Sequence, residues 1–243
     1  MLTQVFAIAV RVLRQLAHDR RFVALSLIVP FFIIWMLNIF FDAVEFPVFR
    51  PKQFIVPAAA FIVHFLTYVL CAIVLVRERT AQTLARMFVN GYQRSSIITG
   101  YILAYSLLAT LQSLIVLISI QVFFELDYAP ETMLAIYGVF WLLALISIAL
   151  GIFVSNFARN EGQVFPFIPL MTMPSVFFSG MIVPVSQMPD WAGFLSTFTP
   201  LYYAIEGLHA LTDNGGDLAM LWGLPPYGLI VLTLATLTLR EQE

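Results

Sequence analysis

The chain has 243 residues, of which 61% are hydrophobic and 11% charged, and its net charge is -2. Soluble domains carry about 45–50% apolar and about 25% charged residues, so a water-soluble fold of this size could not bury so much apolar side chain. One lysine and eleven arginines are too few for a nucleic-acid-binding patch. The single cysteine, Cys71, excludes an intrachain disulfide and a cysteine metal site. The composition indicates a protein embedded in lipid.

Residues 1–21 predict an amphipathic helix. Arg11, Arg14, His18 and Arg21 recur at spacings of three and four, and apolar residues occupy the opposite side: Leu2, Val5, Phe6, Ala9, Leu13 and Leu16. Such a helix suits the cytoplasmic surface of a membrane. The alternative is a positively charged lead-in to the first span, which begins near Phe22 and which we expect to be retained rather than cleaved as a signal peptide.

Six apolar stretches are long enough to cross a bilayer, which takes about 20 helical residues. They are Phe22–Phe41, Phe54–Val76, Ile97–Gln121, Thr132–Val154, Val164–Val185 and Leu218–Leu239. Pro225 and Pro226 interrupt the last stretch, and we expect a kink there. The sequence predicts an all-α polytopic membrane protein forming one domain over residues 1–243.

The basic residues predict the orientation of these spans. With a cytoplasmic N-terminus, only Arg50 and Lys52 fall outside. The inside collects Arg11, Arg14, Arg20, Arg21, Arg77, Arg79, Arg86, Arg94, Arg159 and Arg240. The outside holds the acids Asp42, Glu45, Glu125, Asp127, Glu131, Asp190, Glu206, Asp213 and Asp217. We expect a multi-pass protein of a bacterial or archaeal plasma membrane with both termini in the cytoplasm.

The cytoplasmic loop Arg77–Ser96 predicts a short helix. Thr80 can cap this helix and Gly91 can end it. Its apolar side would consist of Ala81, Leu84, Ala85 and Phe88. Its polar side would present to the cytoplasm Arg79, Gln82, Thr83 and Arg86. The alternative is a basic loop that only sets the topology.

The fifth predicted span is rich in proline. Each proline removes a helical hydrogen-bond donor, and such irregular backbone is tolerated in a membrane only against protein or a water-lined cavity; these prolines are Pro166, Pro169, Pro174 and Pro184. The apolar stretch Ser186–Gly216 follows, and Pro189, Gly193 and Pro200 divide it into pieces too short to span. We expect two short helices that dip back into the outer leaflet.

The sequence lacks the motifs of several chemistries. The phosphate-binding pattern of two glycines five apart followed by Lys and Ser or Thr occurs nowhere. His18, His64 and His209 are isolated, which excludes a helical zinc pair. No carboxylate lies in the six predicted spans, whereas cation antiport needs buried carboxylates along its path. Phe177 stands where a serine hydrolase would have the first glycine of its motif. The sequence therefore shows no motif by which this chain alone could hydrolyse ATP or couple to an ion gradient.

The segment from Glu78 to Met87 reads Glu-Arg-Thr-Ala-Gln-Thr-Leu-Ala-Arg-Met, and Gly100 follows at the start of the third predicted span. It resembles the cytoplasmic coupling segment of the membrane domain of type-2 ABC exporters, a group that includes drug, lipid and polysaccharide permeases. That segment typically reads Glu-Arg-Glu-x-Gly-Thr-Leu-Glu. The present chain matches it at Glu78, Arg79, Thr83 and Leu84, and departs from it at Thr80, Gln82 and Ala85.

A second segment, from Phe178 to Leu208, is similar to the Ser-Gly…Pro…Leu-Pro-x-Trp…Pro-Leu-x-Tyr pattern that follows the fifth span in the same family. Its matching residues, in chain order, are Ser179, Gly180, Pro184, Pro189, Trp191, Pro200, Tyr202, Tyr203 and Glu206. His209 occupies a place where arginine is frequent.

The resemblance implies a coupling helix within residues 77–90 that docks on a separate ATPase subunit through Glu78, Arg79, Thr83, Leu84, Arg86 and Met87. It also implies re-entrant helices within residues 186–211 that, with the residues of the second segment, form an extracellular gate. Two such chains, identical or related, would pair along their first and fifth spans. The chain itself would bind no cofactor and would not be an enzyme, because ATP and Mg²⁺ would sit on the partner subunit.

An exporter of an amphipathic molecule is the leading hypothesis. The apolar spans offer few hydrogen-bonding groups for a sugar chain, which favours a lipid or a hydrophobic drug. Aromatic residues that could stack on sugars keep a polysaccharide open, namely Trp35, Phe61, Tyr105 and Trp141. The alternatives from other classes are a non-transporting scaffold or sensor subunit, a gradient-driven transporter and an intramembrane enzyme.

Overall fold

The structure is a computed structural model that describes residues 2–43, 51–212 and 215–239, with no side-chain description at 51–52. The sequence-based topology assigned roles to Glu45, Arg50, Lys52, Asp213 and Arg240, whose side chains lie outside the described part. The described residues form helices and turns without a strand. The all-α prediction is therefore confirmed for them.

Five segments are long and apolar enough to cross a membrane: Arg20–Ala43, Gln53–Thr80, Arg94–Phe124, Pro130–Ser155 and Leu218–Thr238. The first four lie in the helices α2 (Arg20–Ala43), α3 (Pro51–Thr80), α5 (Arg94–Phe124) and α6 (Pro130–Ser155). Each helix extends a few residues beyond the predicted apolar stretch, because backbone hydrogen bonding continues past the last apolar side chain.

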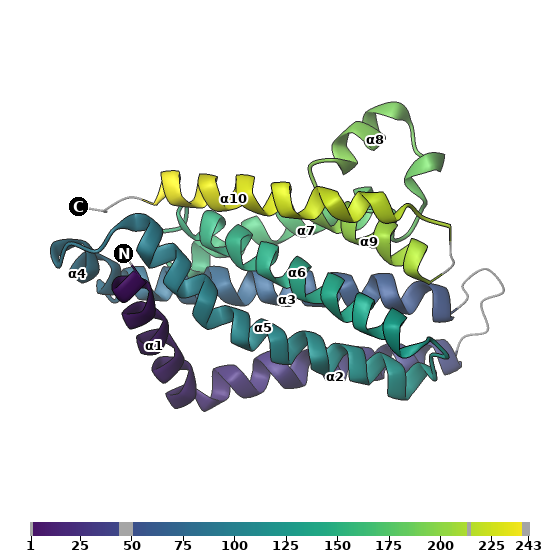
Figure 1. Cartoon of the computed structure of the whole chain (residues 1–243), viewed down its shortest axis with the longest axis horizontal. Coiled ribbons are helices and arrows are strands. Elements are labelled where there is room, and N and C mark those ends of the chain that lie inside the picture. Colours follow the sequence, from purple (N-terminus) through teal and green to yellow (C-terminus); the bar gives the residue numbers. More distant parts are fainter. Residues whose placement is uncertain (1, 44–50, 213–214, 240–243) are drawn as a thin grey trace.

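These helices form an elongated bundle (Figure 1). Helix α6 packs against both α3 and α10 (Leu224–Thr238), and α5 packs against α2 and α6. The largest fully buried side chains are Tyr68, Tyr101 and Phe140, which come from α3, α5 and α6. By contrast, only 17% of the residues in the most apolar part of α2 are buried, so this helix leaves apolar surface free for lipid or another chain.

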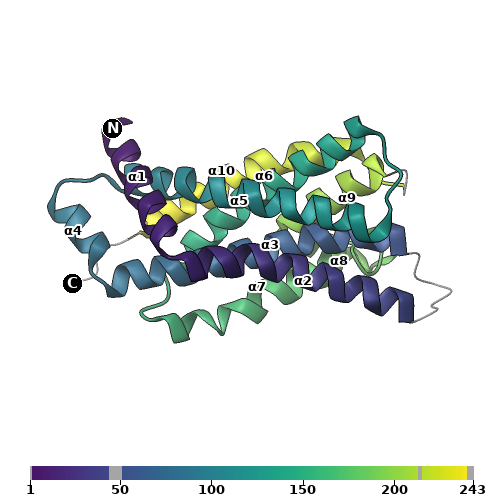
Figure 2. The ribbon, with the colours of Figure 1, turned by 90° about the horizontal axis from the view of Figure 1, so that it is seen from below.

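Helix α1 (Leu2–His18) precedes the bundle and crosses it at a steep angle (Figures 1 and 2). Its buried residues Ile8, Ala9 and Val12 pack against α5. A Cβ added to Gly100 of α5 would lie 2.7 Å from the side chain of Ile8, so the missing side chain at Gly100 permits this close contact.

The fifth predicted span, Val164–Val185, is not among these five segments, and its backbone is irregular. The segment instead holds a 3₁₀ turn, η1 (Glu161–Val164), and the 12-residue helix α7 (Phe167–Phe178). Twelve residues rise about 18 Å, less than the hydrocarbon thickness of about 30 Å. The chain turns immediately afterwards at Gly180, whose φ of +85° is a conformation that glycine adopts without strain.

Short elements follow α7: the 3₁₀ turn η2 (Val185–Gln187), α8 (Asp190–Ser196) and α9 (Pro200–Leu211). A further 3₁₀ turn, η3 (Leu218–Gly223), leads into α10. The kink expected at Pro225 and Pro226 is absent, because these prolines occupy the first turn of α10. A first-turn proline loses no hydrogen bond, since the N–H there has no partner within the helix.

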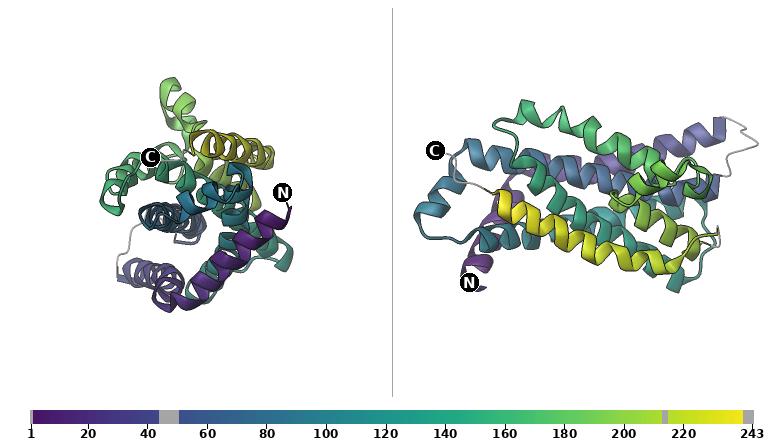
Figure 3. Two further views of the ribbon diagram at one scale, coloured as in Figure 1. Left: turned by 90° about the vertical axis from the view of Figure 1, so that its left-hand side faces the viewer. Right: turned by 90° about the horizontal axis from the view of Figure 1, so that it is seen from above.

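The two ends of the bundle differ in charge (Figures 1 and 3). The N-terminus, the C-terminal end of α10 and the short helix α4 (Thr83–Val89) lie at one end, which we call the α4 end. The α5–α6 connection and α9 lie at the other, the α9 end. Every described arginine belongs to α1 or to a segment at the α4 end, namely Arg11, Arg14, Arg20, Arg21, Arg77, Arg79, Arg86, Arg94 and Arg159.

Candidate functional site

Helix α4 projects from the α4 end of the bundle. Gln82, in a left-handed conformation (φ 57°), separates it from α3. Thr80 does not cap it, contrary to expectation, because Thr80 ends α3 and donates its hydroxyl to the carbonyl of Arg77. Gly91 ends the helix as predicted. Its φ is +76°, and the amides of Gly91 and Tyr92 donate to Phe88 and Met87 in the pattern of a Schellman motif.

The two faces of α4 have different surroundings. Leu84 and Met87 are buried and fix the helix to the bundle. Thr83 is half-buried, whereas Arg86 is exposed and Val89 is 87% exposed. Of the residues predicted to contact an ATPase subunit, Leu84 and Met87 therefore face inward and Arg86 faces outward.

Glu78, another predicted coupling residue, is buried beneath α4. Its side chain is 4% exposed and forms an ion pair with Arg11 of α1, with 3.1 Å between Oε2 and the guanidinium nitrogen. The same nitrogen of Arg11 donates to the hydroxyl of Tyr101 at 2.7 Å. A buried carboxylate requires such a partner. Glu78 thus links α1, α3 and α5 rather than offering its charge to another subunit.

Arg79 does not face the solvent as expected. Its guanidinium donates to the backbone carbonyls of Ser155 and Ala158 and to the side-chain oxygen of Asn156. The Asn156 side-chain amide in turn donates to the carbonyl of Ala235 in α10, at 3.0 Å. A planar guanidinium can satisfy several carbonyls at a helix C-terminus, so Arg79 fastens the ends of α3, α6 and α10 together.

Arg77, which precedes Glu78 in α3, makes ion pairs that are exposed to solvent. It lies 3.7 Å from Asp19 and 3.2 Å from Glu161. Its side chain is 51% exposed, so these pairs contribute little to stability.

The structure brings the predicted gate residues Ser179, Gly180 and Glu206 together at the α9 end. Ser179 is fully buried, and its hydroxyl donates to the carbonyl of Val176. A Cβ built on Gly180 would lie 3.6 Å from Oε1 of Glu206. Partial burial raises the pKa of Glu206, and the negative charge of Asp217 raises it further. The turn after α7 therefore lies against a carboxylate of α9.

The remaining predicted gate residues shape the short helices. Pro184 and Pro189 immediately precede η2 and α8, and Pro200 begins α9. Trp191 is 63% exposed and has its ring edge-on to Phe178, with the centroids 6.1 Å apart.

The two predicted gate tyrosines lie side by side on α9. The ring centroids of Tyr202 and Tyr203 are 5.2 Å apart. The Tyr203 hydroxyl donates to the carbonyl of Thr197 at 3.0 Å, which ties α9 to the end of α8.

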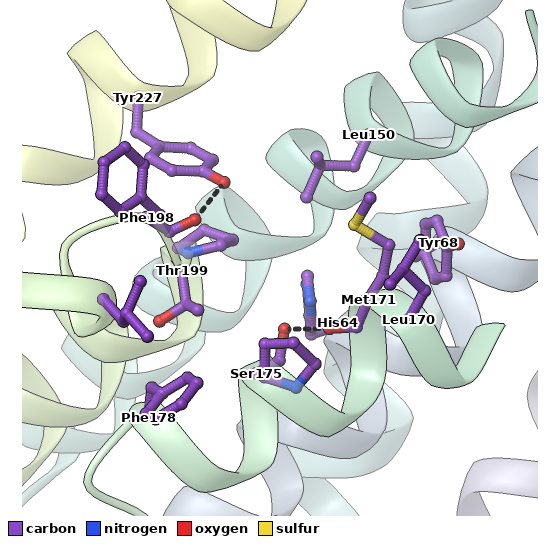
Figure 4. Close-up of a pocket in the computed structure, with 13 residues that line it drawn as sticks. His64, Tyr68, Leu150, Leu170, Met171, Ser175, Phe178, Phe198, Thr199 and Tyr227 are labelled. Atoms are coloured by element: carbon purple, nitrogen blue, oxygen red, sulfur yellow. Dashed lines mark hydrogen bonds between the residues drawn. The ribbon is translucent and has the colours of Figure 1, made fainter. Parts of the chain in front are cut away.

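A cavity of about 280 Å³ lies between the helices α3, α6 and α7 and the segment from Leu195 to Pro200. We call it the α7–α9 cavity (Figure 4). Its walls are mostly apolar, and its polar side chains are His64, Tyr68, Ser175, Thr199 and Tyr227. The sequence did not predict these residues as a site. The signals were the prolines of the fifth stretch, which indicate a cavity-lining backbone, and His64, which is the one His, Asp, Glu, Lys or Arg in a predicted span.

The described residues contain no group of three side chains able to hold a metal ion.

Comparison with known proteins places these features in a family. The chain is 24% identical over 186 residues to the probable multidrug ABC transporter permease YbhR of Escherichia coli, covering 76% of this chain and 50% of that protein. It is 24% identical over 169 residues to the linearmycin resistance permease protein LnrN of Bacillus subtilis, covering 69% and 43%. It is 25% identical over 232 residues to the probable doxorubicin resistance ABC transporter permease protein DrrC of Mycobacterium tuberculosis, covering 92% and 80%.

The chain therefore spans about half the length of the first two relatives. The ABC-2 type transporter family matches residues 3–212, which is most of the chain and includes α4, the buried ion pair and the turn against α9. With its apolar helices and the coupling-like segment at Glu78, this protein belongs to the ABC-2 type transporter family.

Proposed function

We propose that this chain is the membrane-spanning subunit of an ATP-driven exporter whose ATP is hydrolysed by a separate subunit. Membership of the ABC-2 type transporter family and the permease names of its relatives support this role. The sequence has no phosphate-binding loop of its own, so the proposed ATP and Mg²⁺ belong to the partner.

The observation that carries the proposal is the outward face of α4. An apolar side chain that is 87% exposed, Val89, lies on a projecting helix beside the exposed Arg86. The inner side of the same helix is anchored by Leu84 and Met87. A helix anchored on one face and apolar on the other can occupy a groove in a partner protein. In this proposal Val89 and Arg86 dock on the ATPase subunit.

The other predicted coupling residues act through the fold. The ion pair of Glu78 with Arg11 and the bonds of Arg79 to the end of α6 tie the end of α3, which leads directly into α4, to α1 and α6. Movement of α4 would thereby shift α1, α3 and α6 together. ATP binding would favour the arrangement open to the outside by a shift of populations.

The proposed topology places the α4 end in the cytoplasm, following the positive-inside rule. Helix α1 would lie on the cytoplasmic surface, while α8 and α9 would enter the outer leaflet. The chain passes from the α4 end to the α9 end between α6 and α9 (Figures 2 and 3). This broken passage through α7 would serve as the sixth crossing, buried by a second subunit.

The proposal also includes a second permease chain and the class of the exported molecule. Helices α2 and α7 carry exposed apolar side chains, including Phe32, Trp35, Leu170 and Phe177, and would face a second permease chain. The exported molecule would be an amphipathic lipid or drug, in keeping with the apolar interior. The turn formed by Ser179 and Gly180 against Glu206 would open and close the outer side.

The proposal is tested by purifying the C-terminally tagged chain from its native membrane in mild detergent. We expect a stoichiometric ATPase subunit to copurify, and Val89→Asp combined with Arg86→Glu to release it. Glu131→Lys, at the exposed start of α6 on the opposite end, is the matched control and should retain it. A clean complex without a nucleotide-binding protein would contradict the exporter role.

A further inference from the structure

The polar side chains of the α7–α9 cavity have already used their hydrogen-bond donors. The hydroxyl of Tyr68 donates to the carbonyl of Phe167, at 3.1 Å. The other three hydroxyls also donate to carbonyls: Ser175 to Met171 at 2.7 Å, Thr199 to Ser196 at 2.9 Å and Tyr227 to Phe198 at 2.9 Å. A carbonyl can only accept, so each hydroxyl has given up its single proton and keeps only lone pairs for a ligand.

His64 likewise keeps only a hydrogen-bond acceptor for a ligand. Its Nδ1 lies 2.8 Å from the hydroxyl oxygen of Ser147, and that hydroxyl donates its proton to the carbonyl of Leu143 at 2.6 Å. We assign the Ser147 proton to the bond with Leu143, and with that assignment His64 donates through Nδ1 to the Ser147 oxygen. A neutral ring that donates through Nδ1 keeps a bare Nε2, which can accept a hydrogen bond, and His64 lines the cavity (Figure 4).

The backbone around the cavity also lacks hydrogen-bond donors at two prolines. Pro174 lines the cavity inside α7 and gives no N–H to the carbonyl of Leu170, four residues earlier, which also lines it. Pro200, the first residue of α9, likewise has no N–H to offer. The prolines thus withhold backbone donors from the cavity.

No Asp, Glu, Lys or Arg is among the described residues that line the cavity. A buried charge without a partner costs far more than a neutral polar group. A phosphate or carboxylate would in addition meet acceptors only. An ammonium would find acceptors but no counter-charge.

We propose that the α7–α9 cavity binds the polar end of an uncharged amphiphile through the hydroxyl groups of that molecule. The ligand hydroxyls donate to Nε2 of His64 and to the hydroxyl oxygens of Ser175 and Thr199. Apolar side chains such as Leu150, Leu170 and Phe178 receive its hydrocarbon part. This inference rests on the proposed function, since it names the substrate class of the exporter.

The test uses the full-length chain in phosphatidylcholine nanodiscs and a monoacylglycerol with a diazirine in its acyl chain. After illumination, mass spectrometry locates the crosslinks. We expect them in residues 167–178 and 195–200. Unlabelled monoacylglycerol should displace the probe there. The methyl ester of the same fatty acid lacks both hydroxyl groups and should need about thirtyfold more for the same displacement, as for two lost hydrogen bonds. An alkyl phosphate and an alkylamine of equal length should compete no better than the ester.

His64→Phe removes the acceptor and should weaken specific crosslinking about tenfold. His209→Phe, on α9 outside the cavity lining, is the matched control and should change nothing. Ser175→Ala is a gentler second variant, because the Ser175 bond lies within its own helix, and it should weaken crosslinking severalfold with the fold intact.

Equal displacement by monoacylglycerol, methyl ester and phosphate would overturn the inference, as would crosslinks confined to the lipid-facing surface of α2. The crosslinking and displacement results do not depend on whether an ATPase subunit binds the chain. A chain that retains its ATPase but prefers the phosphate refutes the substrate class alone, whereas loss of the ATPase with intact hydroxyl preference refutes the exporter role.

Discussion

At the scale of single residues, the ion pair between Arg11 and Glu78 is asymmetric. The Glu78 side chain is 4% exposed, whereas the Arg11 side chain is 36% exposed. If the pair is broken, the arginine can reach water or headgroups by moving its long side chain, but the carboxylate stays buried. The free energy of unfolding should therefore depend on which partner is removed.

We predict that Arg11→Met lowers the free energy of unfolding by about 3 kcal/mol, because it leaves a buried charge unpaired. Glu78→Gln should cost only about 1 kcal/mol, since the remaining guanidinium is partly solvated. Thermal unfolding of each variant and of the double variant in one detergent measures these costs. A larger loss for Glu78→Gln than for Arg11→Met would contradict the asymmetry.

At the scale of helices, the contact between α3 and α6 is set by a small residue. A Cβ on Gly151 of α6 would lie 2.7 Å from the backbone oxygen of Tyr68 and 2.9 Å from Cβ of Cys71, both in α3. Backbones that approach so closely leave no room for any side chain, as is common where membrane helices pack.

Gly151→Ala should therefore lower the free energy of unfolding by about 2 kcal/mol, because α3 and α6 must separate. Gly138, on the same helix, is the matched control, since a Cβ there would meet nothing within 4 Å. Gly138→Ala should raise stability by about 0.5–1 kcal/mol through the better helix propensity of alanine. Equal effects at the two sites in thermal unfolding would contradict this account of the helix contact.

The sequence predicted the regular helices well and the broken ones poorly, for a physical reason. Four long apolar stretches became α2, α3, α5 and α6, two of them with a single internal proline, Pro30 and Pro57, since a helix satisfies its backbone hydrogen bonds within one segment. The proline-rich stretch could be identified as irregular, but where α7 begins and ends depends on packing against other elements. Hydropathy is calculated from the side chains and does not register the backbone N–H groups that prolines lack.

The bonding partners of the predicted coupling residues could not be predicted from the sequence. The coupling segment does lie at the α4 end, but Glu78 and Arg79 bind within the chain. Both are charged, and a charge near a membrane surface gives no sign of whether its partner is intramolecular. Arg11 lies 67 residues before Glu78 in sequence, so only the tertiary structure reveals the pair.

At the scale of the whole molecule, the two ends of the bundle differ in charge. The described arginines belong to segments at the α4 end, while the α9 end carries acids such as Glu131 and Glu206. Moving this many arginines across a bilayer is costly, so the whole bundle should have one orientation. The proposed docking of an ATPase on α4 requires that orientation to place α4 in the cytoplasm.

Cysteine labelling tests the orientation directly. The one native cysteine, Cys71, is 1% exposed and should not react with a membrane-impermeant maleimide. Glu131→Cys, at the exposed start of α6, should be labelled in intact cells, whereas Val89→Cys on α4 should be labelled only after the membrane is permeabilised. Each variant must first retain the expression level of the parent chain. Labelling of Val89→Cys in intact cells would place α4 outside, away from cytoplasmic ATP, and would refute both the topology and the coupling role of α4.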